Sequence, residues 1–267
     1  MKIKVSHFFS WQRFDDELWP FLLAQFKAGG AENVVLGASW CERLIRETGF
    51  NLKLADCVKQ SGLNFAGAHA PFGAEFDLNI PDNNARNIAL QNHVELMDFA
   101  VANGIKTYTI HVGEFQRGYS VQQMRDFASM MLENLLCAAE VRDIIIAIEN
   151  AEHPGGTLQE LLFYRERFKS SSLGFCYDSG HANINGGDLV LDGIYEDIVT
   201  AHIHDNDGIL DLHLPPGEGS IDWAHVRKKL LKAPRLMSIQ NEVNSIAHNA
   251  SIHSLCEFFN DFVNKEE

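Results

Sequence analysis

The chain has 267 residues, of which 46% are hydrophobic and 22% charged, which argues against wholesale disorder and against a fibrous repeat. Its formal net charge is −14, and no cluster of Lys and Arg offers the basic face that a phosphate-backbone binder uses, so nucleic acid is not an expected partner. The five cysteines are odd in number and form no C-x-x-C pair, which excludes a thiolate zinc site of that pattern and argues against a disulfide framework.

No segment of the sequence has the pattern of a signal peptide or a membrane span. The N-terminal stretch MKIKVSHFFSWQRFDDELW carries arginine and acids where a signal peptide is apolar. No run approaches the ~18 consecutive apolar residues of a transmembrane helix. These features predict a soluble, cytoplasmic protein.

Short β-branched runs alternate with amphipathic stretches along the whole chain. We expect strands at Ile3–Phe9, Asn33–Gly37, Asn64–Ala70, Lys106–Val112, Ile144–Asn150, Gly174–Asp178, Val199–His204 and Met237–Val243. The 3.6-residue pattern predicts helices over 15–30, 82–104, 120–140, 157–169, 221–233 and 250–263. The stretch 40–62 is also helical in pattern, but Gly49 interrupts it.

This alternation predicts the fold class. Strands that alternate with helices form a parallel sheet, and eight such units close most economically into a (β/α)8 TIM barrel. An open doubly wound sheet is the alternative, but the glycine-rich phosphate loops that would favour it, G-x-G-x-x-G and G-x-x-x-x-G-K-[ST], are absent from the sequence. We therefore expect one α/β domain, a TIM barrel spanning 1–267.

Acids and histidines stand where the later strands end, which is where a TIM barrel places its chemistry. The third to eighth strands end in or run directly into His69, His111, Glu149, Asp178 with His181, His202 with His204 and Asp205, and Glu242, and the loop after the seventh adds Asp211 and His213. Each residue alone is more often a satisfied polar group, and Asp178 or Asp205 could simply cap a helix. Together they would repel one another or stay unpaired without a cation, and Glu, Asp and His suit Mn²⁺, Zn²⁺, Co²⁺, Fe²⁺ or Mg²⁺.

At these residues the sequence resembles the xylose-isomerase-like TIM barrels, the superfamily of sugar phosphate isomerases and epimerases that also includes endonuclease IV. The matching segments, spread over nearly the whole chain, are HAPFGAEFDLN, IHVG, IEN, YDSGHAN, HIHDNDG and LPPGEGSIDW. The resemblance implies a metal site of Glu149, Asp178, His202 and Glu242. His202 is preferred to His204 because the run from His202 to Asp205 fits the family's H-x-x-D pattern. The further metal positions of endonuclease IV fall on His69, His111, His181, Asp211 and His213, which leaves a second metal open.

The resemblance also implies the chemistry, an isomerase or epimerase of a ketose or ketose phosphate. Glu149 and Glu242 would be the catalytic pair, moving a proton on an enediolate stabilised by one divalent metal ion (Mn, Zn, Co or Mg). A cation is needed because a proton next to a carbonyl is too weakly acidic for a free carboxylate. His69, His111, His181, Asp211 and His213 would then line the pocket of a small sugar substrate. The oligomeric state stays open, with a homodimer or a homotetramer both compatible.

Three alternatives remain at this stage. An endonuclease IV-like metal phosphodiesterase would use all nine positions, although the acidic loops form a poor surface for a duplex. A dehydratase of a keto-cyclitol or dehydroshikimate would use the same metal, and a barrel could also bind metal without catalysis. Loop aromatics could wall a sugar pocket or simply pack: Phe8, Phe9, Trp11, Trp40, Phe72 and Phe76. The loop bases Arg43, Arg46 and Arg117 could hold a phosphate or be solvated.

Overall fold

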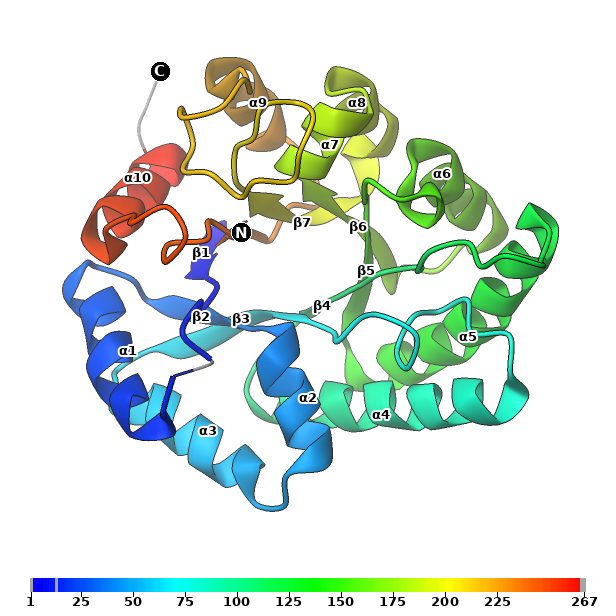
Figure 1. The fold of residues 1–267 in the computed structure, drawn as a ribbon, viewed down its shortest axis with the longest axis horizontal. Helices are drawn as coiled ribbons and strands as arrows, with labels where there is room; N and C mark the ends of the chain where they lie inside the picture. Colours follow the sequence, from blue (N-terminus) through cyan, green and yellow to red (C-terminus); the bar gives the residue numbers. More distant parts are fainter. Residues whose placement is uncertain (1, 13, 265–267) are drawn as a thin grey trace.

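The computed structural model describes residues 2–12 and 14–264 and has a closed barrel of eight parallel strands at its centre (Figure 1). The strands follow one another around the barrel in chain order, and β8 pairs with β1 to close it. They are β1 Lys4–His7, β2 Asn33–Leu36, β3 Asn64–His69, β4 Thr107–Ile110, β5 Ile145–Glu149, β6 Leu173–Asp178, β7 Ile198–Ile203 and β8 Ser238–Asn241. Each predicted strand is present, with its ends within two residues of the prediction. The predicted TIM barrel is confirmed.

The helices form a ring outside the barrel (Figure 1). They are α1 Trp19–Ala28, α2 Ala38–Arg46, α3 Phe50–Gln60, α4 Asn83–Ala102, α5 Val121–Arg142, α6 Leu158–Arg167, α7 Ser179–Asn185, α8 Asp188–Ile194, α9 Trp223–Leu230 and α10 Ile252–Asn264. Three short 3₁₀ turns accompany them: η1 Asp16–Leu18, η2 Pro154–Gly156 and η3 Tyr195–Asp197. Within the described residues no helix is both long and apolar enough to cross a membrane.

Helix ends follow local chemistry. Ser120 begins α5 with a capping box, in which its hydroxyl accepts from the backbone N–H of Gln123 while the Gln123 side chain accepts from the N–H of Ser120. Gly49 separates α2 from α3 with a positive φ of 81°, a conformation that glycine adopts without strain, so the predicted interruption is real. The pair α7 and α8, which the sequence pattern did not predict, fills the connection between β6 and β7.

The apolar core lies between the barrel and the helix ring. Trp19, Trp40 and Phe9 are fully buried there, and the rings of Phe9 and Trp40 stack with their centroids 5.1 Å apart. Phe76 is also buried. These aromatic residues therefore belong to the core and not to a sugar pocket.

The inside of the barrel is polar for a fold in which branched apolar residues usually fill this space. Gln240 donates to the Thr200 hydroxyl at 2.9 Å, and Thr200 in turn lies 2.8 Å from the Ser238 hydroxyl. A side chain at Gly67, which has a φ of 87°, would overlap the Gln240 amide, so only glycine fits there.

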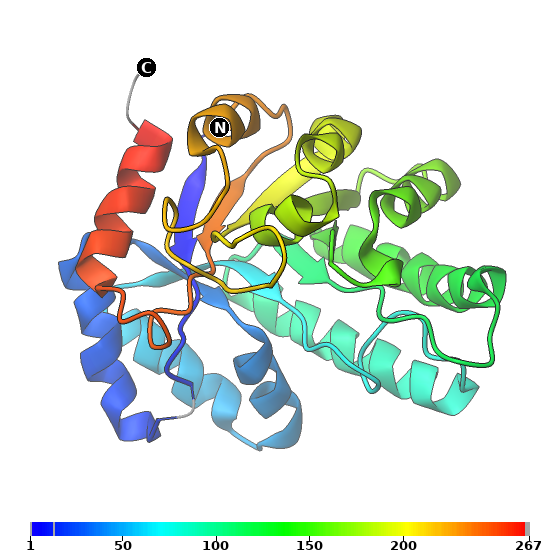
Figure 2. The same cartoon turned by 45° about the horizontal axis from the view of Figure 1, so that its top comes forward.

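The loop from β7 to α9 folds back over the carboxyl ends of the strands (Figure 2). Asp205 and Leu214 form an isolated antiparallel bridge across its base, with both N···O distances at 2.8 Å. The backbone N–H of Asn244, after β8, donates to the carbonyl of His213 at 3.0 Å. The loop is thereby placed at the end of the barrel where the acids and histidines gather.

Candidate metal centre and active-site pocket

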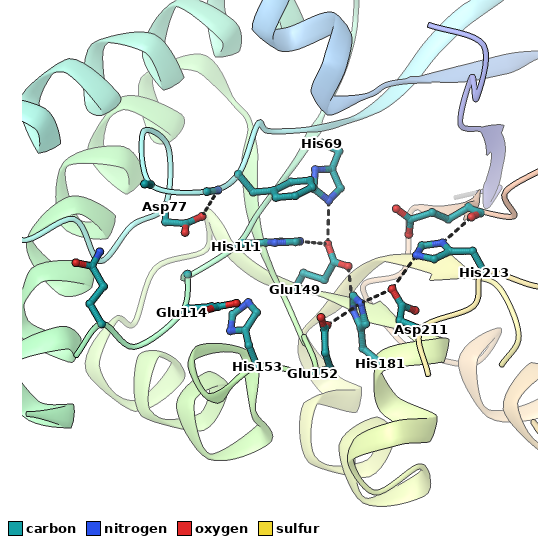
Figure 3. Close-up of a pocket in the computed structure, with 16 residues that line it drawn as sticks. His69, Asp77, His111, Glu114, Glu149, Glu152, His153, His181, Asp211 and His213 are labelled. Carbon is teal, nitrogen blue, oxygen red and sulfur yellow. Dashed lines mark hydrogen bonds and ion pairs between the residues drawn. The ribbon is translucent and has the colours of Figure 1, made fainter. Parts of the chain in front are cut away.

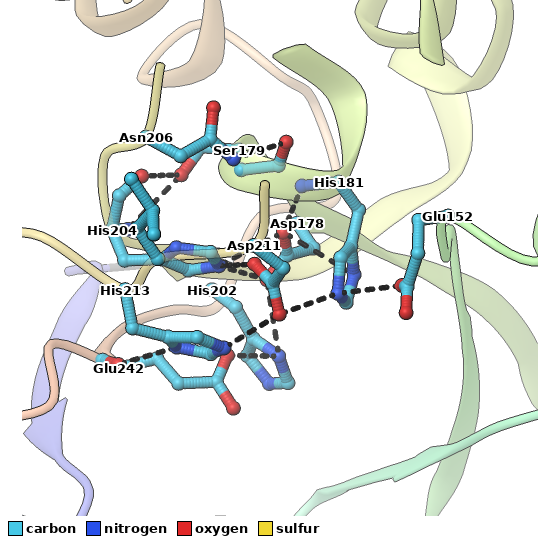
Figure 4. Close-up of polar contacts among 12 residues, drawn as sticks. Glu152, Asp178, Ser179, His181, His202, His204, Asn206, Asp211, His213 and Glu242 are labelled. Carbon is cyan, nitrogen blue, oxygen red and sulfur yellow. Dashed lines mark hydrogen bonds and ion pairs between the residues drawn. The ribbon is translucent and has the colours of Figure 1, made fainter. Parts of the chain in front are cut away.

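The structure brings together the four residues predicted as the principal metal site. Glu149 ends β5, Asp178 ends β6, His202 lies in β7 and Glu242 follows β8. One nitrogen or oxygen from each lies within 4.8 Å of the others. His202 Nδ1 is 3.0 Å from Glu242 Oε2 and 3.9 Å from Asp178 Oδ2 (Figure 4). It is also 3.2 Å from Glu149 Oε1. Parallel strands that end side by side produce this convergence.

The centre is buried, and its charged groups contact mainly one another. His202 and Asp178 are 0% exposed and Glu149 is 2% exposed. Within the described part of the chain, both ring nitrogens of His202 and Oε2 of Glu242 lack a hydrogen bond of ordinary geometry, although His202 Nδ1 and Glu242 Oε2 lie 3.0 Å apart as an ion pair. Unpaired buried polar atoms are costly, and native proteins rarely leave them so. Three carboxylates around an imidazole form an oxygen- and nitrogen-rich set that fits Mn²⁺, Zn²⁺, Co²⁺ or Mg²⁺.

The two glutamates are held in their ionised form. Burial alone would raise the pKa of the Glu149 carboxyl, but the imidazoles of His202 and His111 outweigh it and keep the pKa well below its usual range. The same balance, with His202 and His213 opposing burial, lowers the pKa of Glu242. Both side chains therefore offer negative oxygens to a cation or to a proton.

His204 supports Asp178. Its Nε2 lies 3.1 Å from both carboxylate oxygens, while Asp178 Oδ1 also accepts from the backbone N–H of His181 at 2.7 Å and so caps α7. Asp178 is thus a helix cap and a member of the cluster at once. The His204 ring occupies the space in which a side chain at Gly180 would stand. Ser179 fixes the His204 backbone, since its hydroxyl donates to the carbonyl at 2.7 Å and accepts from the N–H at 3.0 Å.

His181 links the centre to outer acids. Its Nδ1 lies 2.9 Å from the Asn150 carbonyl, to which it donates, and 3.5 Å from Glu149 Oε1. Its Nε2 lies 3.1 Å from Glu152 Oε2 and 3.5 Å from Asp211 Oδ2. Burial would lower the pKa of His181, but the Asp178, Asp211 and Glu149 carboxylates raise it well above its usual value. The His181 side chain, in the first turn of α7, therefore connects the buried cluster to Glu152 and Asp211.

His69 and His111 approach the second oxygen of Glu149. Each places its Nε2 3.2 Å from Glu149 Oε2. Nδ1 of His69 lies 2.7 Å from the Ala70 carbonyl and must donate to it, so a neutral His69 directs the lone pair of Nε2 toward a carboxylate. Only a proton or a cation between the two atoms makes that arrangement favourable. One atom each of His69, Glu149 and His202 also lie within 4.8 Å of one another, so these three residues could hold a cation, although Glu149 and His202 also belong to the four-residue cluster.

Asp211 and His213 reach the site from the β7–α9 loop. His213 has a φ of 51°, which is uncommon outside glycine and strains the backbone. Its Nδ1 donates to the Glu242 carbonyl at 2.9 Å, and its Nε2 lies 2.9 Å from Asp211 Oδ2. Burial would lower the pKa of His213, but Asp211 and Glu242 raise it to about 10.

The rings of His213 and His204 are parallel, with centroids 3.9 Å apart and an interplanar angle of 9°. One atom each of His204, His213 and Glu242 lie within 4.8 Å of one another. Imidazole lone pairs lie in the ring plane, however, so two stacked rings cannot point at one ion. In this arrangement His204 acts as a support and is not a ligand of a shared cation.

A cavity of about 630 Å³ adjoins this cluster of side chains, and Figure 3 draws the residues that line it. Glu149 and Glu242 line it, together with all five accessory residues predicted from the sequence: His69, His111, His181, Asp211 and His213. Sequence reasoning missed Glu152 and His153, which also line it. Both lie within three residues of the IEN segment, so their place shortly after a strand end was an available signal.

Of the aromatic and basic loop residues considered from the sequence, some line the cavity and others do not. Phe72 lines the cavity, and its ring stacks on His111 at 5.0 Å, whereas Phe8 packs edge-on against His69 and His202. Trp11 packs against the core, on Phe9 and Phe26. Two possible phosphate-binding bases are engaged elsewhere: Arg43 pairs with Asp16 and Glu47, and Arg46 with Glu75. Neither arginine lines the cavity.

Comparison with known proteins agrees with this architecture. An uncharacterised protein of Methanocaldococcus jannaschii, MJ1311, is 30% identical over 188 residues, which cover 65% of this chain and 63% of that protein. The 3-keto-D-glucoside 4-epimerase YcjR of E. coli superposes with a TM-score of 0.77 at 16% identity, covering 97% of this chain and 99% of that one. The IolI protein, solved with a bound zinc atom, also gives 0.77, at 15% identity, covering 98% and 99%. Likeness at such identity shows a shared fold.

The sequence profile of the xylose isomerase-like TIM barrels matches residues 36–245, a span that contains every candidate ligand described above. This chain belongs to the family of xylose isomerase-like TIM barrels.

Proposed function

We propose that the protein is a divalent-metal-dependent isomerase or epimerase of a small polyhydroxy ketone, with Glu149 and Glu242 as the proton-transferring residues. One observation carries the proposal. Of the four residues in the cluster, Glu149 and Glu242 line the cavity, whereas Asp178 and His202 lie beneath it. A substrate above the cluster would therefore meet two carboxylates from separate strands.

The proposed cation is held by Glu149, Asp178, His202 and Glu242. When bound, it supplies positive charge that stabilises negative charge on a substrate oxygen and polarises the carbonyl. Asp178 and His202 are fully buried and hold their positions, and His204 keeps the Asp178 carboxylate oriented. One tightly held ion fits this set, and Mn²⁺, Zn²⁺, Co²⁺ and Mg²⁺ all accept such ligands.

The chain's own contribution is the movement of a proton. An ionised Glu149 or Glu242 accepts a proton at a carboxylate oxygen from the carbon beside the substrate carbonyl. In an isomerisation the same carboxyl returns the proton to the former carbonyl carbon, while the proton of the neighbouring hydroxyl passes to the former carbonyl oxygen. In an epimerisation the partner glutamate, having taken a proton from water, delivers one to the opposite face. His69, His111, His181, Asp211 and His213 would orient the hydroxyl groups of the substrate from the cavity wall.

The test is isotope exchange. A panel of ketoses and ketose phosphates, incubated in deuterated water with the Mn²⁺-loaded protein, is expected to gain deuterium on the carbon beside the carbonyl. Metal content of the protein purified without added metal is measured in parallel. Cleavage of abasic DNA with no exchange on any ketone would overturn the proposal.

A second candidate is an endonuclease IV-like phosphodiesterase. It is favoured by the pair His69 and His111, which both face one oxygen of Glu149 and could share a second cation with it. Two or more ions per chain after purification would support it. A dehydratase of a keto-cyclitol or dehydroshikimate type is also compatible with the cluster, and loss of water from the substrate would identify it.

A further inference from the structure

The cavity walls are rich in hydrogen-bond acceptors and poor in free donors. Six carboxylates line it: Asp77, Glu114, Glu149, Glu152, Asp211 and Glu242. Within the described part of the chain, its lining includes no Lys, Arg, Ser, Thr, Tyr or Trp. Ionised carboxylates only accept, so a ligand that fills this space has to bring donors of its own.

Three of the five histidines that line the cavity add no free donor, because the protein already uses their N–H groups. His213 donates to the Glu242 carbonyl, His69 to that of Ala70 and His181 to that of Asn150. The remaining nitrogens of these rings face carboxylates: Glu149 for His69, Glu152 and Asp211 for His181, and Asp211 for His213. The wall as a whole therefore offers many acceptors and few free donors, and its positive charge is limited to imidazoles already paired with these carboxylates.

The outer part of the cavity, away from the four-residue cluster, is also rich in carboxylates. Figure 3 shows Asp77, Glu114 and His153 on one side of Glu149, and Asp211 and His213 on the other. Asp77 accepts the backbone N–H of Gly73 through Oδ1 at 2.8 Å, which leaves Oδ2 for a ligand. Burial raises the pKa of Asp77, which reflects how poorly this region solvates negative charge.

Arginine side chains that could offset these acids stand elsewhere, and the imidazoles of His181 and His213 are already paired with carboxylates. Arg43 and Arg46 form ion pairs outside the cavity. Arg117 is exposed and follows Gln116, which does line the cavity, so it stands at the rim without contributing to the wall. A divalent cation would bring two positive charges, but Glu149, Asp178 and Glu242 already oppose them with three negative ones.

We propose, resting on the proposed function, that the site selects hydroxyl-rich ketones without a phosphate or carboxylate group, and that Asp77 and Glu114 set this selectivity. Substrate hydroxyls donate to the outer carboxylates. A phosphate or carboxylate in the same place would lie among like charges, with no Lys or Arg in the described lining to pair with it. Among the dehydratase substrates, a keto-cyclitol fits this rule and a carboxylate such as dehydroshikimate does not.

The experiment compares matched substrates in deuterated water with the Mn²⁺-loaded protein. A ketohexose, its terminal phosphate and its terminal amine are followed by their rates of deuterium uptake. The neutral ketose is expected to exceed its phosphate by about ten-fold or more in kcat/KM, a cost of about 1.4 kcal/mol for the anion. The amine, which keeps hydrogen-bond donors, is expected to lose less than the phosphate does.

Variants test whether Glu114 in the cavity wall causes the preference for the neutral ketose. Glu114→Lys is expected to lower the ratio of kcat/KM for the ketose to kcat/KM for its phosphate by about ten-fold. Glu114→Gln should lower this ratio by less, because it removes a negative charge without introducing a positive one. The control is Glu257→Lys, an equal change of charge on exposed α10, which should leave the ratio unchanged. If Glu257→Lys lowers the kcat/KM ratio as much as Glu114→Lys does, the net charge of the protein alone is responsible, and the proposed role of Glu114 is overturned.

Failure of this inference differs from failure of the proposed function. If the phosphate exchanges faster than the ketose and Arg117→Ala removes that preference, the selectivity is wrong while the proton chemistry stands. If no ketone exchanges at all, the proposed function fails, and calorimetric titration of the Mn²⁺-loaded protein with the same three compounds still ranks them. Tighter binding of the phosphate in that titration would overturn the inference.

Discussion

The imidazole of His204 faces the carboxylate of Asp178 symmetrically, with Nε2 3.1 Å from each of its two oxygens. Both residues are 0% exposed, so no water competes for the contact. Groups that orient metal-ligating side chains in this way tune affinity although they do not touch the ion.

The first prediction concerns this contact. His204→Gln is expected to weaken divalent-metal affinity by about 10- to 100-fold, because a flexible amide orients the Asp178 carboxylate less firmly than the packed imidazole does. Competition against a chromophoric chelator measures the change. His225→Gln, at an exposed histidine paired with Asp188, is the matched control and should keep the affinity. Equal affinities for the two variants would contradict the role of His204.

Removal of either glutamate charge should stop turnover. Glu149→Gln and Glu242→Gln are each expected to lower the rate of deuterium exchange by about 10²- to 10⁴-fold, the usual contribution of a positioned acid or base. Metal affinity should fall without disappearing, since three ligands remain in each variant. Metal content and exchange rate are measured on the same preparations. Full activity in both variants would show that the proton travels by another route.

The barrel could be predicted from the sequence because short apolar runs, many of them rich in Val, Ile or Thr, alternate with long stretches of helical pattern. Seven-residue α7 and α8 could not, since two helical turns beside Gly186 and Gly187 leave too little periodicity to detect. Gly49, by contrast, correctly predicted the break between α2 and α3, because glycine is unfavourable inside a helix.

The candidate site was predictable to the extent that it follows topology. Parallel strands bring their ends to one place, so Glu149, Asp178, His202 and Glu242 had to approach one another. The pairing of side chains did not follow, because it depends on loop paths: Arg43 reaches back to Asp16, and Glu152 reaches forward to His181. Neither contact can be predicted from the local sequence pattern, because its two residues lie far apart in the chain.

The β7–α9 loop depends on one buried carboxylate. Asp205 is 0% exposed and accepts from the N–H groups of Asn206, Gly217 and Ile221 and from the indole of Trp223. Asp205→Asn would direct an amide donor at N–H donors, with an expected loss of about 1.5–3 kcal/mol in the free energy of unfolding. The loop carries Asp211 and His213, so kcat/KM for the ketose should fall while affinity for the principal metal changes little.

Denaturant unfolding, Trp223 fluorescence, metal titration and kinetics together test this prediction. Asp207→Asn is the control, because Asp207 lies in the same loop, is exposed and accepts from Ile209 and Leu210. If Asp205→Asn loses metal affinity in proportion to activity, the carboxylate holds the metal centre and not the loop alone.

Stability should depend on pH through His93. Its Nδ1 lies 2.8 Å from the Tyr108 hydroxyl and its Nε2 2.8 Å from the Phe76 carbonyl, and burial lowers its pKa to about 4. The unfolded chain, with a pKa of about 6.5, binds the proton more readily, so this contribution is complete above pH 6.5 and is lost as the pH falls toward 4.

His93→Gln should therefore flatten the fall in unfolding free energy by up to about 1.4 kcal/mol per pH unit in that window. Urea titrations between pH 4 and pH 7 measure it, and His253→Gln, at an exposed position, serves as the control. Parallel curves for wild type and His93→Gln would rule out titration of the buried imidazole.

Gly180 has no side chain, yet the His204 ring fills the space where one would begin. Any replacement, even alanine, would displace the imidazole from Asp178 and loosen its stacking on His213. In a saturation library scored by metal-dependent activity, this glycine should tolerate as few substitutions as the ligands themselves. A map of intolerance drawn from such a library would therefore mark Gly180 as part of the active site, although it holds neither the ion nor the substrate.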